Sequence, residues 1–104
     1  MNLIELLHDI TTGKTDLILA GNNLDEEMKS FLVSWYSKYA NNTEADIIVI
    51  LDLLCFLYIN HDIDVSTPKL FTEKTDYLSE RFEINRDLFY SMLSDFRKLV
   101  YTNA

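Results

Sequence analysis

The chain has 104 residues, which fits one domain and leaves little room for a second. Hydrophobic residues make up 48% of it, and only two glycines and one proline interrupt it, which excludes extended disorder and argues against a many-turned β-sandwich or barrel. The formal net charge is −8, and such a surface repels nucleic acid and anionic membranes while it attracts basic partners.

The first predicted elements are short. Residues 3–10 have the apolar spacing of an amphipathic helix, and residues 15–20 fit either a short helix or an extended piece, with Gly13 and Gly21 as boundaries. A longer helix is predicted from Asn23, its N-cap, to about Tyr39. Its apolar face, which we expect to lie in the core, consists of Leu24, Met28, Phe31, Leu32, Trp35, Tyr36 and Tyr39.

The next predicted helix is the most apolar segment of the chain. Thr43 and Asp46 have the spacing of a capping box, and they stand directly before the apolar run 47–59. The run begins with β-branched residues, so a buried strand is the alternative. Its length and its cap favour a central helix over residues 43–60 that is buried nearly all round.

Two helices are predicted in the last third. Thr67 and Pro68 form a good N-terminus, with proline at the first helical position. Asn85 is expected to cap the last helix, with Ile84 and Phe89 as a hydrophobic staple. The sequence therefore predicts an all-α fold: a single compact bundle of about five helices over residues 1–104, with the central helix at 43–60.

The expected location is the cytoplasm. The chain opens without a basic segment and a cleavage-like site, so we expect no signal peptide. The run 47–59 is too short to span a bilayer, and Asp52 interrupts it. Cys55 is the sole cysteine, which rules out an internal disulfide, and we expect it to be a small buried hydrophobic residue.

Two His–Asp dipeptides, His8–Asp9 and His61–Asp62, resemble the metal-binding pair of the HD phosphohydrolases, a helical family. That family needs a further histidine and a further aspartate on other helices, and this chain has only two histidines. Surface or capping roles are therefore favoured for these residues.

The segment after the central helix also resembles the start of a calcium-binding EF-hand loop, with Asp62, Asp64 and Ser66 at alternate positions. Thr67 stands where that loop needs glycine, and Pro68 already begins a helix. A turn-rich loop is the better interpretation. We expect no metal, no cofactor and no catalytic residue.

The acidic side chains of the helix after Pro68 form a regular pattern. Glu73, Asp76, Glu80 and Glu83 follow one another by three, four and three residues, so they share one helix face. Asp62 and Asp64 of the preceding loop could continue that face. A solvated face is the alternative to a docking surface. An exposed tyrosine, Tyr58 or Tyr77, could serve as the anchor of such a surface. The predicted partner-binding residues are Asp62, Asp64, Glu73, Asp76, Tyr77, Glu80 and Glu83.

Asp52 is surrounded by apolar neighbours in the central helix. A lone buried charge is costly, so we expect Asp52 to pair with Arg81 or Lys74, which the helical spacing places toward the apolar side of their helix. The alternative is that the long basic side chains extend to solvent without a partner.

In size, acidity and helicity the whole chain resembles the bacterial immunity proteins of colicins and of contact-dependent inhibition systems. That resemblance implies a non-enzymatic inhibitor that binds and neutralises a basic toxin nuclease, without contacting nucleic acid or membrane, and that is a monomer or a weak homodimer when unbound. One alternative is a phage-encoded inhibitor that mimics nucleic acid and blocks a host defence complex, which requires acids spaced like phosphates. Another is a regulatory helical module that self-associates.

Overall fold

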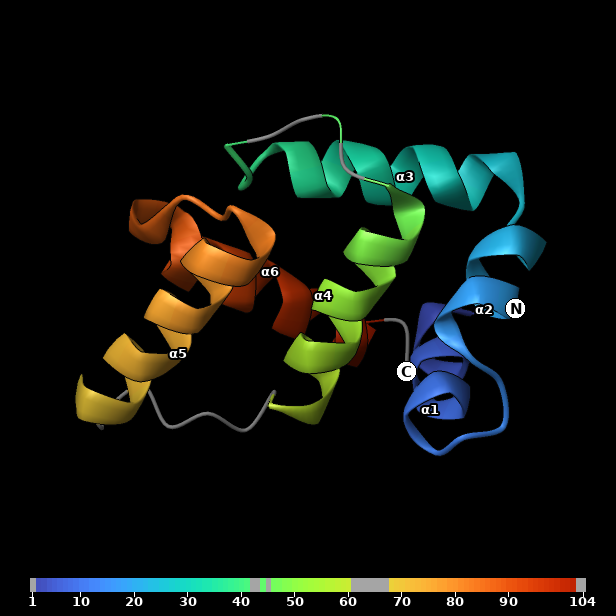
Figure 1. The fold of residues 1–104 in the computed structure, drawn as a ribbon, viewed down its shortest axis with the longest axis horizontal. Helices are drawn as coiled ribbons and strands as arrows, with labels where there is room; N and C mark the ends of the chain where they lie inside the picture. Colours follow the sequence, from blue (N-terminus) through green and yellow to red (C-terminus); the bar gives the residue numbers. More distant parts are fainter. Residues whose placement is uncertain (1, 42–43, 45, 61–67, 103–104) are drawn as a thin grey trace.

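A computed structural model describes residues 2–41, 44, 46–60 and 68–102 (Figure 1). The described part is all-α, as the sequence predicts, and contains no strand beyond one isolated β-bridge. Its elements are α1 (Leu3–Thr11), α2 (Leu17–Asn23), α3 (Glu26–Ser37), α4 (Ile47–Ile59), α5 (Pro68–Phe82), the short 3-10 helix η1 (Arg86–Leu88) and α6 (Phe89–Thr102).

Helix α4 lies at the centre of the fold, where α1, α2 and α3 pack against it (Figure 1). Its sequence is apolar apart from Asp52, and six of its 13 residues are buried. The fully buried ones are Ile50, Leu51, Leu53, Leu54 and Leu57. Burial of that much apolar surface is the main stabilising contribution that this helix makes. The prediction of an apolar central helix is confirmed, but its burial nearly all round is wrong, because Val49 and Ile59 remain exposed.

The helices begin at residues whose side chains accept a hydrogen bond from the first turn. Asn2 caps α1, Asp16 caps α2 and Asp25 caps α3. The expected cap of the third helix, Asn23, is wrong, because Asn23 belongs to the last turn of α2. The carboxylate of Asp25 accepts from the backbone N–H of Met28 at 2.7 Å and sets the start of α3 instead.

The cap of α4 is Asp46, whose carboxylate accepts from the N–H of Ile48 at 2.9 Å. The predicted start at Thr43 is therefore too early, and Thr43 itself lies outside the described residues. Gly21 was predicted to be a boundary of this segment, but it lies inside α2. A Cβ atom there would stand 3.1 Å from Cγ1 of Ile48, so glycine allows α2 to approach α4 closely.

A short turn and the 3-10 helix η1 connect α5 to α6. Helix α5 ends at Phe82, and Glu83 follows with φ 56°, a left-handed conformation that helices often use at their C-terminus. The chain then pairs briefly with the segment after α3: the N–H of Asn41 donates to the carbonyl of Glu83, and the N–H of Asn85 donates to the carbonyl of Tyr39, both at 2.8 Å. Asn85 caps η1, which leads directly into α6.

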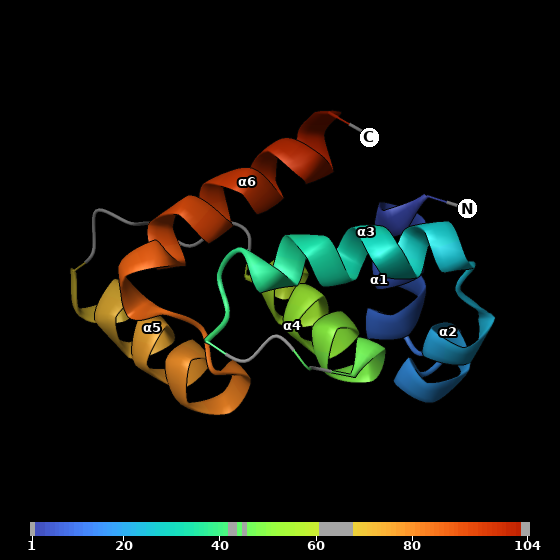
Figure 2. The ribbon, with the colours of Figure 1, turned by 90° about the horizontal axis from the view of Figure 1, so that it is seen from above.

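The aromatic residues of α3 and of the turn that follows it divide between core and surface. Trp35, Tyr36 and Tyr39 are buried, as predicted. Phe31, which was expected on the same buried face, is 47% exposed. The local spacing places it on the apolar side of α3, but only part of its ring is covered. Helices α1 and α2 lie at one end of the molecule and α5 at the other, with α6 running behind α4 (Figures 1 and 2).

Helix α4 buries Cys55, as predicted. Burial raises the pKa of this thiol to about 11, and the nearby charge of Asp52 contributes in the same direction. Among the helices of the described residues, none is long and apolar enough to cross a membrane.

Candidate partner-binding surface on helix α5

Helix α5 is buried on one side only. Thr75, Leu78 and Phe82 face the core, whereas Glu73 and Glu80 are exposed. Tyr77 follows Glu73 by four residues and precedes Glu80 by three, so these three side chains share a helix face. We refer to Glu73, Tyr77 and Glu80 as the α5 surface. It contains three of the seven predicted partner-binding residues.

Tyr77 is 44% exposed, yet its ring is held by neighbours. It stacks on Phe56 of α4, with 4.9 Å between the ring centroids and 28° between the planes. Its edge also meets the ring of Phe82, with centroids 6.3 Å apart. Such contacts fix the orientation of the ring while one side stays open to solvent.

The prediction that Asp52 has a basic partner is confirmed for Arg81. Nη2 of Arg81 lies 2.8 Å from Oδ2 of Asp52, and both side chains are partly exposed. The hydrogen bond and the charge of Asp52 raise the pKa of Arg81. Lys74 instead places its ammonium group over the ring of Phe56, 5.3 Å from the centroid. These contacts link α5 to α4 beside the Tyr77 stack.

The acidic face of α5 is less negative than the sequence pattern suggests. The carboxylate of Asp76 is paired with Arg86, which η1 brings back toward α5. Lys69 is exposed four residues before Glu73, on the same helix face. Local spacing could have identified Lys69, whereas the Arg86 pair depends on the turn after α5.

The prediction that Glu83 continues this face is wrong. Helix α5 ends at Phe82, and the left-handed backbone of Glu83 turns the chain away. Its proximity to Tyr36 nevertheless has an effect. Burial raises the pKa of the Tyr36 hydroxyl, and the charge of Glu83 adds to this shift. Asp62 and Asp64, which were predicted to extend the acidic stripe, lie outside the described residues.

Comparison with models of known protein families, with curated proteins and with solved structures finds no match.

The other predicted features lie away from α5. Nδ1 of His8 is 3.3 Å from the hydroxyl of Tyr58, and both line a shallow polar depression of about 490 Å³ between α1 and α4. Tyr58, the other candidate anchor, is thus partly buried. The described residues contain no group of three or more histidine, cysteine, aspartate and glutamate side chains placed to hold a metal ion. His61 and Ser66 lie outside them.

Proposed function

We propose that this protein is a small inhibitor that binds a basic protein partner through the α5 surface, in the manner of an immunity protein that neutralises a toxin nuclease. The observation that carries the proposal is the arrangement around Tyr77. An aromatic ring, oriented by Phe56 and open to solvent, stands between two exposed carboxylates, Glu73 and Glu80.

This arrangement suits the physical chemistry of protein recognition. Aromatic side chains that are already oriented bury a large area at little entropic cost, and tyrosine is enriched among the residues that contribute most to binding. Carboxylates around such an anchor attract basic groups and accelerate association. A nuclease site is basic because it holds phosphates, so an acidic surface that occupies it also blocks it.

The nucleic-acid mimic receives less support from the described face. A mimic needs a regular row of acids in place of phosphates. On α5 the acids begin only after Lys69, and Asp76 is paired with Arg86. A few acids around an aromatic anchor correspond better to a protein interface than to a nucleic-acid backbone.

The test begins with affinity capture of a partner by the wild-type chain, followed by stopped-flow association kinetics with the purified partner. Replacing both carboxylates, Glu73→Lys with Glu80→Lys, should slow association about ten-fold or more at low ionic strength, and salt should reduce the difference. Tyr77→Ala should instead accelerate dissociation, by about ten-fold or more.

The matched control is Glu5→Lys with Glu26→Lys, which makes the same change in net charge on exposed residues of α1 and α3. Circular dichroism should verify that each variant keeps its helicity. The proposal is wrong if the captured partner is not basic at the site of contact. It is also wrong if the control pair slows association as much as the α5 pair.

A further inference from the structure

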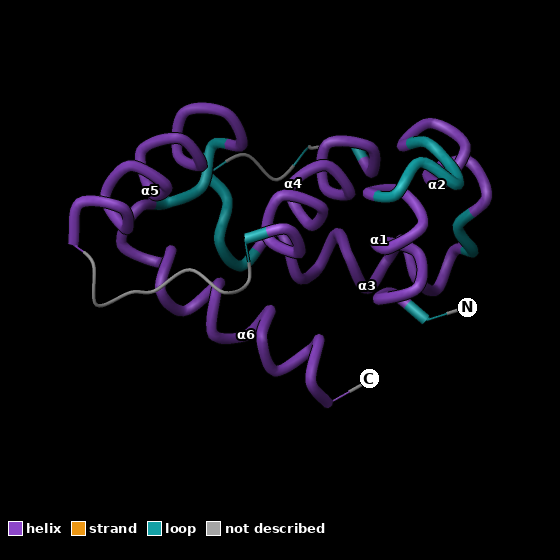
Figure 3. Tube along the Cα trace, turned by 90° about the horizontal axis from the view of Figure 1, so that it is seen from below, coloured by secondary structure: helices purple, strands orange, loops and turns teal. Residues whose placement is uncertain are grey.

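A second surface lies at the other end of the molecule, where the first turn of α1, the first half of α3 and the last turns of α6 converge (Figures 2 and 3). An open groove of about 410 Å³ lies between these elements. Its apolar lining consists of Leu3, Ile4, Met28, Phe31 and Leu99. We refer to these five residues as the terminal groove.

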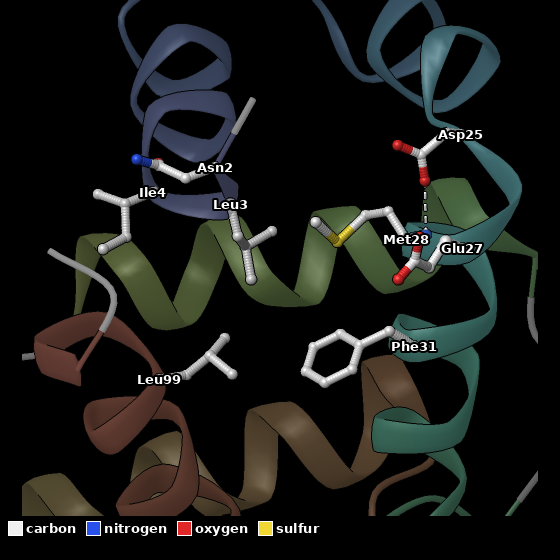
Figure 4. A pocket seen from close by; sticks show the side chains of 8 residues that line it. All are labelled: Asn2, Leu3, Ile4, Asp25, Glu27, Met28, Phe31 and Leu99. Atoms are coloured by element: carbon white, nitrogen blue, oxygen red, sulfur yellow. Dashed lines mark hydrogen bonds between the residues drawn. The ribbon is translucent and has the colours of Figure 1, made fainter.

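Figure 4 shows how the groove is built. Phe31 of α3 and Leu99 of α6 point toward each other from opposite sides, and Leu3 and Met28 project into the space between their helices. Leu3 is buried and forms part of the floor, whereas Phe31 keeps almost half of its surface exposed. The groove therefore combines a packed floor with an apolar wall that water still reaches.

The exposure of Phe31 is the first argument that the groove has an occupant. A half-covered phenylalanine on an otherwise buried helix face would gain free energy from any apolar group that covers it. Met28 adds adaptability, because its unbranched thioether side chain fits differently shaped neighbours.

The polar rim defines the chemistry of that occupant. Asp25, Glu27 and Asn2 are the polar residues that line the groove, and no basic side chain lines it among the described residues. One carboxylate oxygen of Asp25 accepts the N–H of Met28 as the cap of α3. The rim is thus acidic beside an apolar wall, which complements a positive charge next to an apolar side chain.

We propose that the terminal groove docks a basic amphipathic helix of a protein partner, with apolar side chains against Phe31 and Leu99 and with lysine or arginine beside Asp25 and Glu27. Apolar anchors spaced by three, four and seven residues are the general mode by which a helix occupies such a groove. The site is separate from the α5 surface and does not depend on the function proposed for it.

The experiment uses two synthetic helical peptides as probes. Both carry the same row of leucines at helical spacing, and they differ in having lysine or glutamate on the flanks of that row. In a titration of the ¹⁵N-labelled chain followed by NMR, the lysine peptide should shift the amides of Met28, Phe31 and Leu99. The glutamate peptide should bind about ten-fold or more weakly at low salt.

Variants of the chain assign the two contributions separately. Phe31→Ala should weaken the lysine peptide about five- to ten-fold, because only the exposed half of the ring is available to it. Glu27→Lys should remove most of the preference for the lysine peptide and leave the leucine contact in place. The matched control is Tyr90→Ala, an exposed aromatic residue of α6 outside the groove, which should change neither affinity.

Three results would overturn the proposal. The first is equal binding of the two peptides, because the acidic rim would then select nothing. The second is a shift pattern confined to α2 or α5. The third is that the chain alone dimerises in sedimentation equilibrium and that Phe31→Ala abolishes the dimer, since a second copy would then be the occupant.

Discussion

Helices α4 and α5 are neighbours that are stabilised in different ways. Helix α4 packs against α1, α2 and α3 and buries six of its 13 residues. Helix α5 buries one side, and aromatic and polar contacts of single side chains link it to α4: the Phe56–Tyr77 stack and the Asp52–Arg81 pair. The core therefore constrains the buried residues of α4, whereas the outer face of α5 is available for recognition.

The largest expected difference concerns side-chain truncation in the two helices. Leu54→Ala in α4 leaves a cavity in a fully buried environment and should lower the free energy of unfolding by about 2–5 kcal/mol. Tyr77→Ala in α5 should cost less, because the ring is already partly in water. Urea denaturation followed by circular dichroism measures both. Equal losses would mean that α5 belongs to the core as fully as α4.

The buried thiol of α4 predicts a dependence of stability on pH. The pKa of Cys55 is about 11 in the folded state, whereas the thiol of the unfolded chain has its ordinary pKa of 9.0. The folded state therefore binds more protons between these two values. The free energy of unfolding should therefore fall as pH rises from 9 toward 11. The fall should be smaller in Cys55→Ala. A fall of the same size in both would show that this thiol makes no contribution.

A single hydrogen bond tests the attachment of α5 to α3. The hydroxyl of Tyr36 donates to the carbonyl of Phe82 at 2.7 Å in a buried position. Tyr36→Phe removes the donor and leaves that carbonyl without it, so the free energy of unfolding should fall by about 1–2 kcal/mol. Tyr90→Phe, at an exposed position of α6, is the control and should change little in the same denaturation experiment.

The smallest expected effect is a gain in stability at the end of α5. Glu83 occupies a left-handed backbone conformation that strains most residues but not glycine. Glu83→Gly should raise the free energy of unfolding by up to about 1 kcal/mol. Glu80→Gly, inside the helix, should lower it by a similar amount. A loss at both positions would indicate that the side-chain interactions of Glu83 outweigh the backbone strain.

The candidate surface was only partly accessible to sequence reasoning. The spacing of the acids placed Glu73 and Glu80 on one face of the helix, since residues three and four apart are neighbours on any helix. Tyr77 was predicted only as a possible anchor, without a place on that face. The same rule assigned Asp76 and Glu83 to that face without information on the following turn. That turn brings Arg86 to Asp76 and ends the helix before Glu83, so the continuous acidic stripe predicted from spacing becomes shorter and partly neutralised.

By itself, the sequence determined the all-α class and the apolar central helix, because apolar periodicity acts through composition and local geometry. The cost of a lone charge suggested a basic partner for Asp52 but left open Arg81, Lys74 or no partner at all. Tertiary structure decided which surfaces remain open. Phe31 lies on the apolar side of α3 by its spacing, yet it stays half exposed at the groove that α3 forms with α1 and the end of α6. How closely α1, α3 and α6 approach one another depends on all the side chains packed between them, and no single segment carries that information.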